Sequence, residues 1–331
     1  MSESNKRQVE FESLRGLSIV LLLLLHSEII SGSAFGYSLD PVAKFIGAFL
    51  LGSFFFLAGY FMDSSVQKYR NDVLGFIKSR FVRIFPPYWL SLIFFFIMYT
   101  LKRYEQVVYL ANLQAVFSPE FVKPLLTLWY ISMLVVYYIL FGVMLWNTRS
   151  NRSLLFAAVG VFTVSYILHA TTGLLDQRFF RYFPIFLVGI YFYRFESVRK
   201  KLLDLSPFYK ILLVLLGSAG FLLVQFKGFS LTNGFHIIAV DFFILSWVLL
   251  WLSIFRTSIG EWRIWVFLSV ASYFAYLFHR PIWHGLHLVT DPEAWGGIPM
   301  FVFLPGTVVT LIVGYFLQRG YDRLLAALHL K

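Results

Sequence analysis

The sequence contains no cysteine, so disulfide bonds and thiolate chemistry are excluded. Charged residues are scarce as well: they make up 14% of the 331 residues, against 59% that are hydrophobic and 20% that are aromatic. The mean hydropathy is +0.74. Soluble domains do not have this balance, because roughly a quarter of their residues are charged. The composition therefore predicts a polytopic membrane protein, folded as a single domain over residues 1–331.

Acidic residues are fewer than basic ones: the sequence has 17 Asp and Glu and 28 Lys and Arg, which gives a formal net charge of +11. A strong basic excess is also a feature of nucleic-acid-binding proteins. Here the charges lie in short segments between apolar runs, where membrane orientation and contact with anionic lipids explain them better. We expect membrane lipid, and no nucleic acid, among the partners.

Ten apolar runs of near-spanning length follow one another with brief connections, which predicts an all-α fold of about ten transmembrane helices. The runs cover 11–31, 42–62, 84–102, 125–146, 153–172, 180–194, 209–226, 237–255, 264–288 and 300–318. The sixth run is short and contains Pro184, which predicts a tilted, broken or partly embedded helix. Segments 64–83 and 319–331 have the pattern of interfacial segments.

An even number of spans places both termini on one side of the membrane. With the N-terminus inside, 20 of the 28 Lys and Arg residues fall at inner positions, and 8 at outer or deeper ones. Positive residues accumulate in cytoplasmic loops. We therefore expect both termini in the cytoplasm and the protein in the cytoplasmic membrane.

The first apolar run carries two ionisable residues, Arg15 near its start and His26 near its far end. Eleven residues of α-helix turn the chain by about 1100° and advance it by about 16 Å, so both side chains share one stripe at two depths. In the expected orientation Arg15 lies near the cytoplasmic face and His26 in the outer half. Ionisable residues inside a span are expensive and mark functional sites. The alternative is a purely structural histidine.

A second basic feature, Arg80-Phe-Val-Arg83-Ile-Phe-Pro86-Pro87, lies where the chain enters the third run. Residues three apart are neighbours on a helix, and guanidinium groups suit phosphate oxygens. The two prolines predict an interrupted or restarted helix. Together with Arg15, these arginines have two interpretations: inner-face charge that contacts lipid phosphates, or a site for a phosphorylated cytoplasmic ligand.

Polar groups from later runs are expected near the depth of His26. The alternation of spans brings Asp241 to about 7 Å from the outer boundary, and His279 and Arg280 toward the same level. A histidine held by a carboxylate is a common general base, so Asp241 is a candidate to orient His26. The alternative is a structural Asp241 that pairs with Arg280 or lies at the outer mouth.

Motifs at five places along the chain form a set with one order and spacing. They are Arg15-x10-His26, Phe54-Phe-Phe-Leu-Ala-Gly59-Tyr60-Phe61, Arg80-x2-Arg83-Ile-Phe-Pro86-x-Tyr88-Trp89, Trp129, and Ser272-Tyr273-x2-Tyr276-Leu277-x-His279-x-Pro281. This set resembles the membrane acyltransferase-3 family over nearly the whole chain. One departure follows Trp129, where many relatives carry an acidic pair and this chain has none. In this it resembles stand-alone members, without a fused hydrolase-like domain.

The resemblance implies a ten-helix membrane fold that transfers acyl groups, usually acetyl from acetyl-CoA, to hydroxyls of cell-surface glycans or glycolipids. It also assigns roles to residues, which we take as expectations. His26 is expected to be catalytic with Arg15 essential beside it, and Arg80 and Arg83 are expected to engage the donor. Apart from these roles, we expect His279, Tyr276 and Trp129 to lie on the acceptor side.

We therefore predict an O-acyltransferase that moves an acyl group, most often acetyl, from cytoplasmic acyl-CoA to a hydroxyl of a surface polysaccharide or lipid-linked glycan, without a metal. Direct transfer is favoured, because the chain has no cysteine and no convincing serine nucleophile beside His26; an acyl-histidine route stays open. The alternative function is a transporter of a lipid-linked sugar or acyl donor that does no chemistry. Transporters often show internal repeats, and this sequence shows none.

Overall fold

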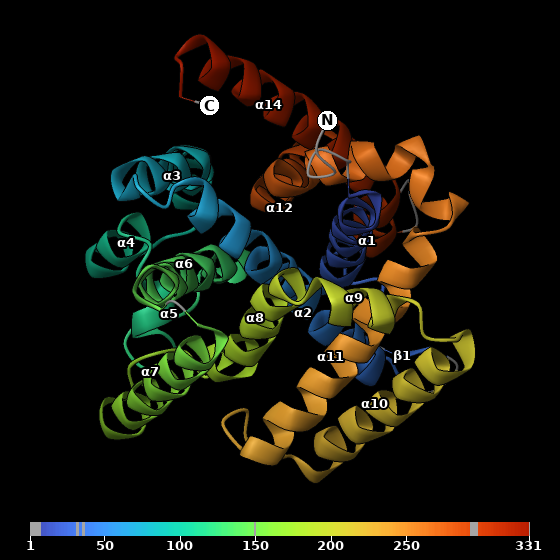
Figure 1. Ribbon diagram of the computed structural model, residues 1–331. Helices are drawn as coiled ribbons and strands as arrows, with labels where there is room; N and C mark the ends of the chain where they lie inside the picture. The colour runs from blue at the N-terminus through green and yellow to red at the C-terminus, as the bar shows by residue number, and fades with distance from the viewer. Residues whose placement is uncertain (1–7, 31–32, 35–36, 149, 292–296, 331) are drawn as a thin grey trace.

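Helices dominate the computed structural model, which describes residues 8–30, 33–34, 37–148, 150–291 and 297–330 (Figure 1). The prediction of a helical fold is confirmed. The strands in the described residues are limited to β1 and β2, which have two residues each and pair with one another. In chain order the elements are α1 Val9–His26, β1 Ser33–Ala34, β2 Tyr37–Ser38, α2 Asp40–Lys68, α3 Val73–Met98, α4 Arg103–Leu110, α5 Gln114–Phe117, η2 Leu126–Leu128, α6 Trp129–Asn147, α7 Asn151–Thr172, α8 Arg178–Arg194, α9 Glu196–Leu203, α10 Pro207–Lys227, α11 Gly234–Phe255, η3 Ser258–Glu261, α12 Arg263–Val289, α13 Ile298–Phe301, η5 Val302–Gly306 and α14 Thr307–Ala327.

Seven helical segments in the described part of the chain are long and apolar enough to cross a membrane. They are Asp40–Lys68, Val73–Met98, Leu126–Asn147, Asn151–Thr172, Pro207–Lys227, Gly234–Phe255 and Ile298–Ala327. The three remaining runs that we expected to span also form helices, namely α1, α8 and α12. Helix α8 has only 17 residues, and charged and polar side chains lower the apolarity of α1 and α12.

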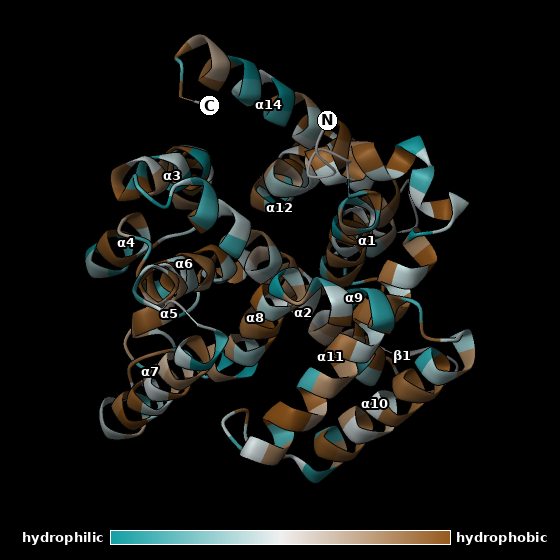
Figure 2. Cartoon of the chain, in the orientation of Figure 1, coloured by the Kyte–Doolittle hydropathy of each residue, from teal (hydrophilic) through white to brown (hydrophobic). Residues whose placement is uncertain are grey.

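Central and peripheral helices differ in how much of their surface the protein covers. In the most apolar part of α2 and of α6, 61% and 67% of residues are buried, against 17% in α7 and 28% in α10. Hydrophobic residues cover much of α7 and α10 in Figure 2, whereas hydrophilic residues gather on α9 and along the end of α14. An apolar surface of this extent is stable in lipid, so α7 and α10 form the lipid-facing periphery.

Helix α1 lies in the interior, where it packs against α2, α11 and α12 (Figure 1). It ends at His26, five residues before the end of the run 11–31 that we predicted as a span. The chain leaves the helix because Glu28 has a left-handed backbone (φ 64°). The hydroxyl of Ser27 donates to the carbonyl of Leu24 at 2.8 Å and so satisfies part of the helix end. His26 therefore occupies the last turn of α1 and not its middle.

The prediction of an interrupted helix at Pro86 and Pro87 is wrong, because α3 runs through both prolines. A proline removes one N–H and leaves the carbonyl four residues earlier without its helical partner. The hydroxyl of Tyr321 donates to the freed carbonyl of Val82. Tyrosines of distant helices can thus replace the lost hydrogen bonds of a helix inside a membrane.

Segment 64–83, which we expect at the membrane interface, contains the end of one long helix and the start of the next. Helix α2 continues to Lys68 and α3 begins at Val73, so most of that stretch belongs to two long helices joined by a short turn. The side chain of Asp72 accepts a hydrogen bond from the Gly75 N–H at 2.8 Å and caps the start of α3. Helix α8 is likewise continuous through Pro184.

Helices α2 and α8 cross closely because each has a glycine at the contact. A Cβ atom on Gly59 would lie 2.0 Å from the carbonyl oxygen of Phe186, and one on Gly189 would lie 2.3 Å from that of Phe56. No side chain fits at such distances, so glycine permits the approach.

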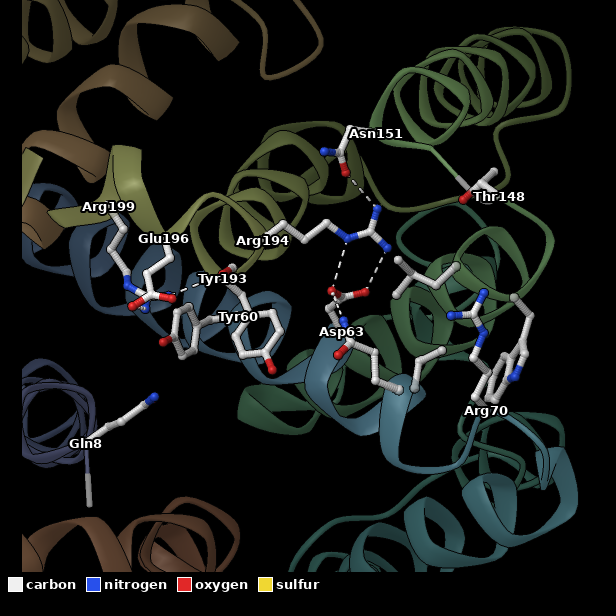
Figure 3. A pocket seen from close by; sticks show the side chains of 14 residues that line it. Gln8, Tyr60, Asp63, Arg70, Thr148, Asn151, Tyr193, Arg194, Glu196 and Arg199 are labelled. Atoms are coloured by element: carbon white, nitrogen blue, oxygen red, sulfur yellow. Dashed lines mark hydrogen bonds and ion pairs between the residues drawn. The ribbon is translucent and has the colours of Figure 1, made fainter. Parts of the chain in front are cut away.

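A buried ion pair fixes the same two helices at the end where α2 stops. The Arg194 guanidinium donates to both carboxylate oxygens of Asp63, at 2.8 and 3.0 Å, and to Asn151 at 3.1 Å. Figure 3 shows this arginine between Asp63 and Asn151, in the wall of a cavity of about 680 Å³. Asp63 is 1% exposed. A bidentate pair of this kind ties α2 to α8 and, through Asn151, to the start of α7.

Asp63→Ala is expected to lower the free energy of unfolding by about 3 kcal/mol, because it leaves the Arg194 guanidinium without its carboxylate. Thermal unfolding of the purified protein in detergent measures the loss. The matched control is Glu196→Gln, which removes the exposed Glu196–Lys200 pair and should leave the unfolding midpoint unchanged. Equal effects of the two variants would show that the Asp63–Arg194 pair does not hold the helices together.

Candidate active site

Three arginines selected from the sequence line one cavity. Arg15 of α1 and Arg80 and Arg83 of α3 surround a space of about 400 Å³, which we call the arginine cavity. Its remaining lining residues come from α2, α6 and α12. The prediction that these residues would form one basic cluster is confirmed in space, although Arg15 lies on a different helix from Arg80 and Arg83.

Contacts that are not ionic hold these arginines in place. The Arg15 guanidinium lies 5.5 Å from the ring centroid of Phe61, and that of Arg80 lies 4.8 Å from Tyr138. Arg80 also donates to the hydroxyl of Ser65. Among the described residues, none of the three arginines forms an ion pair with a carboxylate. Positive charge around a cavity without a protein anion favours an anionic ligand.

A second, smaller cavity of about 140 Å³ lies against His26, and we call it the histidine cavity. Trp129 and Arg280 line it together with His26. Much of the remaining wall is aliphatic and consists of Leu22, Leu25, Leu50, Leu51 and Leu126. A small apolar space beside an imidazole excludes bulk water from whatever reacts there.

His26 forms a hydrogen bond with His279 and not with a carboxylate. The distance from His26 Nδ1 to His279 Nε2 is 3.1 Å, and the two ring planes differ by 7°. His279 is fully buried, and its Nδ1 lies 2.8 Å from the carbonyl oxygen of Tyr276. A carbonyl only accepts, so His279 Nδ1 carries a proton and its Nε2, in the neutral ring, accepts from His26 Nδ1. The chain of bonds leaves a lone pair on His26 Nε2, as a general base requires.

Two tyrosines belong to the walls of both cavities. Tyr130 of α6 and Tyr276 of α12 line the arginine cavity and the histidine cavity alike. Their ring centroids are 5.5 Å apart, at 67°. The hydroxyl of Tyr276 donates to the backbone carbonyl of Thr127. The pair of rings thus forms the partition between the space around the arginines and the space around His26.

Asp241 lies elsewhere than the sequence suggested. It does not line the histidine cavity, and no hydrogen bond in the described part of the chain joins it to His26 or His279. Its nearest charged neighbour is Arg181 of α8, and one of its carboxylate oxygens is buried without a hydrogen-bond partner. His279 therefore lies beside His26, in the place where we had expected Asp241.

Trp129 is held by a residue that sequence reasoning missed. The guanidinium carbon of Arg178 lies 3.7 Å from the centroid of a Trp129 ring, and Arg178 forms a salt bridge with Asp176. A guanidinium stacked at this distance makes a favourable cation–π contact and fixes the ring. The signal in the sequence was the Asp176-x-Arg178 spacing ahead of the sixth run. It does not reveal the contact with Trp129, 49 residues earlier.

Metal ligands do not gather at the site. Within the described residues, no group of three or more His, Asp or Glu side chains is arranged to hold a metal ion. His26 lines the histidine cavity and His279 lies behind it, and a metal site of usual composition needs more ligands than these two histidines.

Comparison with known protein families agrees with the motifs. A family model described as an acyltransferase domain matches residues 8–319, which is nearly the whole chain. Comparison with curated proteins and with solved structures found no match. The matched range includes both cavities and every residue named above as lining them.

Proposed function

The chain belongs to the acyltransferase-3 family, and on this premise we propose that it is a membrane O-acyltransferase that uses acyl-CoA, with acetyl as the group transferred. The acceptor is a hydroxyl of a cell-surface polysaccharide or a lipid-linked glycan. The observation that carries the proposal is the hydrogen-bonded pair His26–His279. His26 lines a cavity that shares Tyr130 and Tyr276 with the cavity around three arginines that form no ion pair among the described residues.

The donor is proposed to bind in the arginine cavity. Coenzyme A carries phosphates, and guanidinium groups bind phosphate oxygens with charge-assisted hydrogen bonds. Arg80 and Arg83 engage these phosphates, while Arg15 lies deeper along α1, on the way to His26. The thioester end of the donor then extends past Tyr130 and Tyr276 into the histidine cavity. Both termini face the cytoplasm in this arrangement, so the arginine cavity receives acyl-CoA from the cytoplasm.

The chemical step is a direct transfer. His26 Nε2 removes the proton of an acceptor hydroxyl while its oxygen attacks the thioester carbonyl. The tetrahedral intermediate collapses as the carbon–sulfur bond breaks, and the leaving thiolate takes the proton from His26. The products are the acyl ester and the free thiol of coenzyme A. His279 acts as a positioning residue, because it holds His26 in the tautomer with a free Nε2 lone pair.

The acceptor is proposed to enter the histidine cavity from the opposite side to the donor. Trp129 offers an indole face, and Arg178 stacked on it keeps the ring in one orientation. Sugars present apolar C–H faces to aromatic rings, which makes Trp129 the residue for acceptor contact. Lipid-linked or extruded glycans carry hydroxyls at the outer side of the membrane, where these residues lie in the proposed orientation.

Purified protein in proteoliposomes, given acetyl-labelled acetyl-CoA and acceptor glycan, tests the function directly. The wild type is expected to move label onto the glycan. His26→Ala should abolish transfer while the protein still inserts and accumulates, because the base is lost. Movement of the glycan or donor across the membrane without transfer would support the transporter instead. Transfer that persists in His26→Ala would rule out the proposed base.

Arg80→Gln and Arg83→Gln are each expected to raise the KM for acetyl-CoA about tenfold or more, since each loses a charge-assisted contact with the donor. The KM for the acceptor should stay constant. Arg70→Gln is the matched control, because Arg70 is exposed and lines a different cavity. If all three variants change the KM equally, general surface charge and not the arginine cavity binds the donor.

His279→Leu is expected to lower kcat by about 10²-fold or more, with both KM values nearly unchanged, because His26 loses the acceptor that fixes its tautomer. His279→Gln should retain most of the activity, since an amide oxygen can accept from His26 Nδ1. Steady-state kinetics of both variants separates a positioning role from a structural one. Equal losses in the two variants would contradict the proposed tautomer.

A further inference from the structure

Two residues that line the histidine cavity each carry a buried hydrogen-bond donor without a partner in the described part of the chain. The donors are the Nε of Arg280 and the Oγ1 of Thr127. Both residues line the cavity beside His26. Buried polar groups in proteins are almost always hydrogen-bonded, so each exception calls for a reason. Inside a membrane the reason is stronger, because no lipid group can satisfy them.

The surroundings of Arg280 show that its position is not explained by an ion pair within the cavity. The residue follows His279 on α12, and its guanidinium lies 5.9 Å from the ring centroid of Trp283. Glu28 is the carboxylate whose charge acts on it, but Glu28 does not line the cavity. A cation beside a small, largely aliphatic space is expensive unless a negative charge appears there.

Thr127 lies in η2, directly before α6, and is 6% exposed. Its backbone carbonyl accepts from the Tyr276 hydroxyl, which fixes the position of the residue against α12. Its side-chain hydroxyl makes no hydrogen bond. Thr127 and Arg280, which come from different helices, therefore both line one cavity of about 140 Å³.

We propose that the Arg280 Nε–H and the Thr127 hydroxyl form an oxyanion hole for the acyl group. The inference rests on the proposed transferase function and deepens it. As the acceptor oxygen forms a bond to the thioester carbon, the carbonyl π electrons move to the carbonyl oxygen, which becomes negatively charged. The two donors bind that oxygen until the carbon–sulfur bond breaks and the carbonyl re-forms. Donors placed in advance stabilise the transition state more than the ground state.

The assignment gives each group in the cavity a distinct task. His26 takes the proton, His279 fixes its tautomer, and Arg280 and Thr127 hold the developing charge. Tyr276 is already engaged through its hydroxyl with the Thr127 carbonyl. Arg280 and Thr127 are therefore catalytic residues of a kind that the motif comparison did not suggest, and their loss has a kinetic signature different from that of a substrate-binding residue.

Kinetics in the labelled-acetyl-CoA assay tests the oxyanion hole. Arg280→Gln is expected to lower kcat and kcat/KM together by about 10²–10³-fold, the range for removal of one oxyanion donor, and Thr127→Val by about tenfold or more. Both KM values should change little. Thr127→Val changes the shape of the side chain very little, and Arg280→Lys keeps the positive charge. These two variants therefore still test the oxyanion hole if Arg280→Gln fails to fold.

Arg181→Gln is the matched control. Arg181 is another membrane-embedded arginine with a buried, unpaired Nε, but it lies on α8 and does not line the histidine cavity. Its kcat should stay within about threefold of the wild type, because the lost donor is remote from the reacting oxygen. A drop as large as that of Arg280→Gln would overturn the assignment, because embedded charge in general would explain the loss.

Two further outcomes would also overturn the oxyanion hole. A rise in the acceptor KM with an unchanged kcat in Arg280→Gln would show that Arg280 recognises an anionic group of the acceptor. Unchanged kinetics in both Arg280→Gln and Thr127→Val would show that neither donor contacts the reacting oxygen. A wild-type protein that transfers no label, by contrast, overturns the proposed function itself and this inference with it.

Discussion

The hydrogen bond between His26 and His279 joins residues 253 positions apart, and the arrangement of the site depends on it. It connects the last turn of α1 to the middle of α12, and through His279 it reaches the backbone of Tyr276. In lipid, every polar group must find its partner inside the protein. The imidazoles of His26 and His279 meet this requirement, because they hydrogen-bond to each other and to one backbone carbonyl. The Nε2 atom of His26 stays available. The bond therefore sets the rotation of α12 relative to α1 and, with it, the face that carries Arg280.

The same requirement explains features that lie far from His26. Tyr321 satisfies the carbonyl that Pro86 frees in α3, and Asp63 pairs with Arg194 between α2 and α8. These contacts keep helices straight and close where prolines or charges would otherwise disturb them. Straight, close helices are needed because the two cavities are built from side chains of α1, α2, α3, α6 and α12. Small shifts of any one helix would separate the arginine cavity from the histidine cavity or merge the two.

The two cavities also suggest how chemistry in a membrane is divided by depth. Three arginines line one space, and a largely aliphatic wall with His26 and Arg280 lines the other, while Tyr130 and Tyr276 line both. In the proposed function, a phosphorylated donor binds in the first space and its uncharged thioester end extends into the second. The proposed reaction needs no charged substrate group beside His26 except the transient oxyanion. This division would account for an arginine and a histidine on one stripe of α1.

The sequence alone determined the helical class of the protein and the common face of Arg15 and His26. These properties follow from apolar run length and the helical period, which are local. It also selected Arg80 and Arg83, which line one cavity with Arg15, while the end of α1 at His26 and the continuity of α3 through two prolines escaped it. Only the tertiary structure decided that His279 and not Asp241 meets His26, and that Arg178 lies on Trp129. When a helix is apolar on nearly all sides, the spacing of its apolar residues does not show which face points inward or which helices it contacts. Those contacts are fixed by packing between distant segments, which no short stretch of sequence contains.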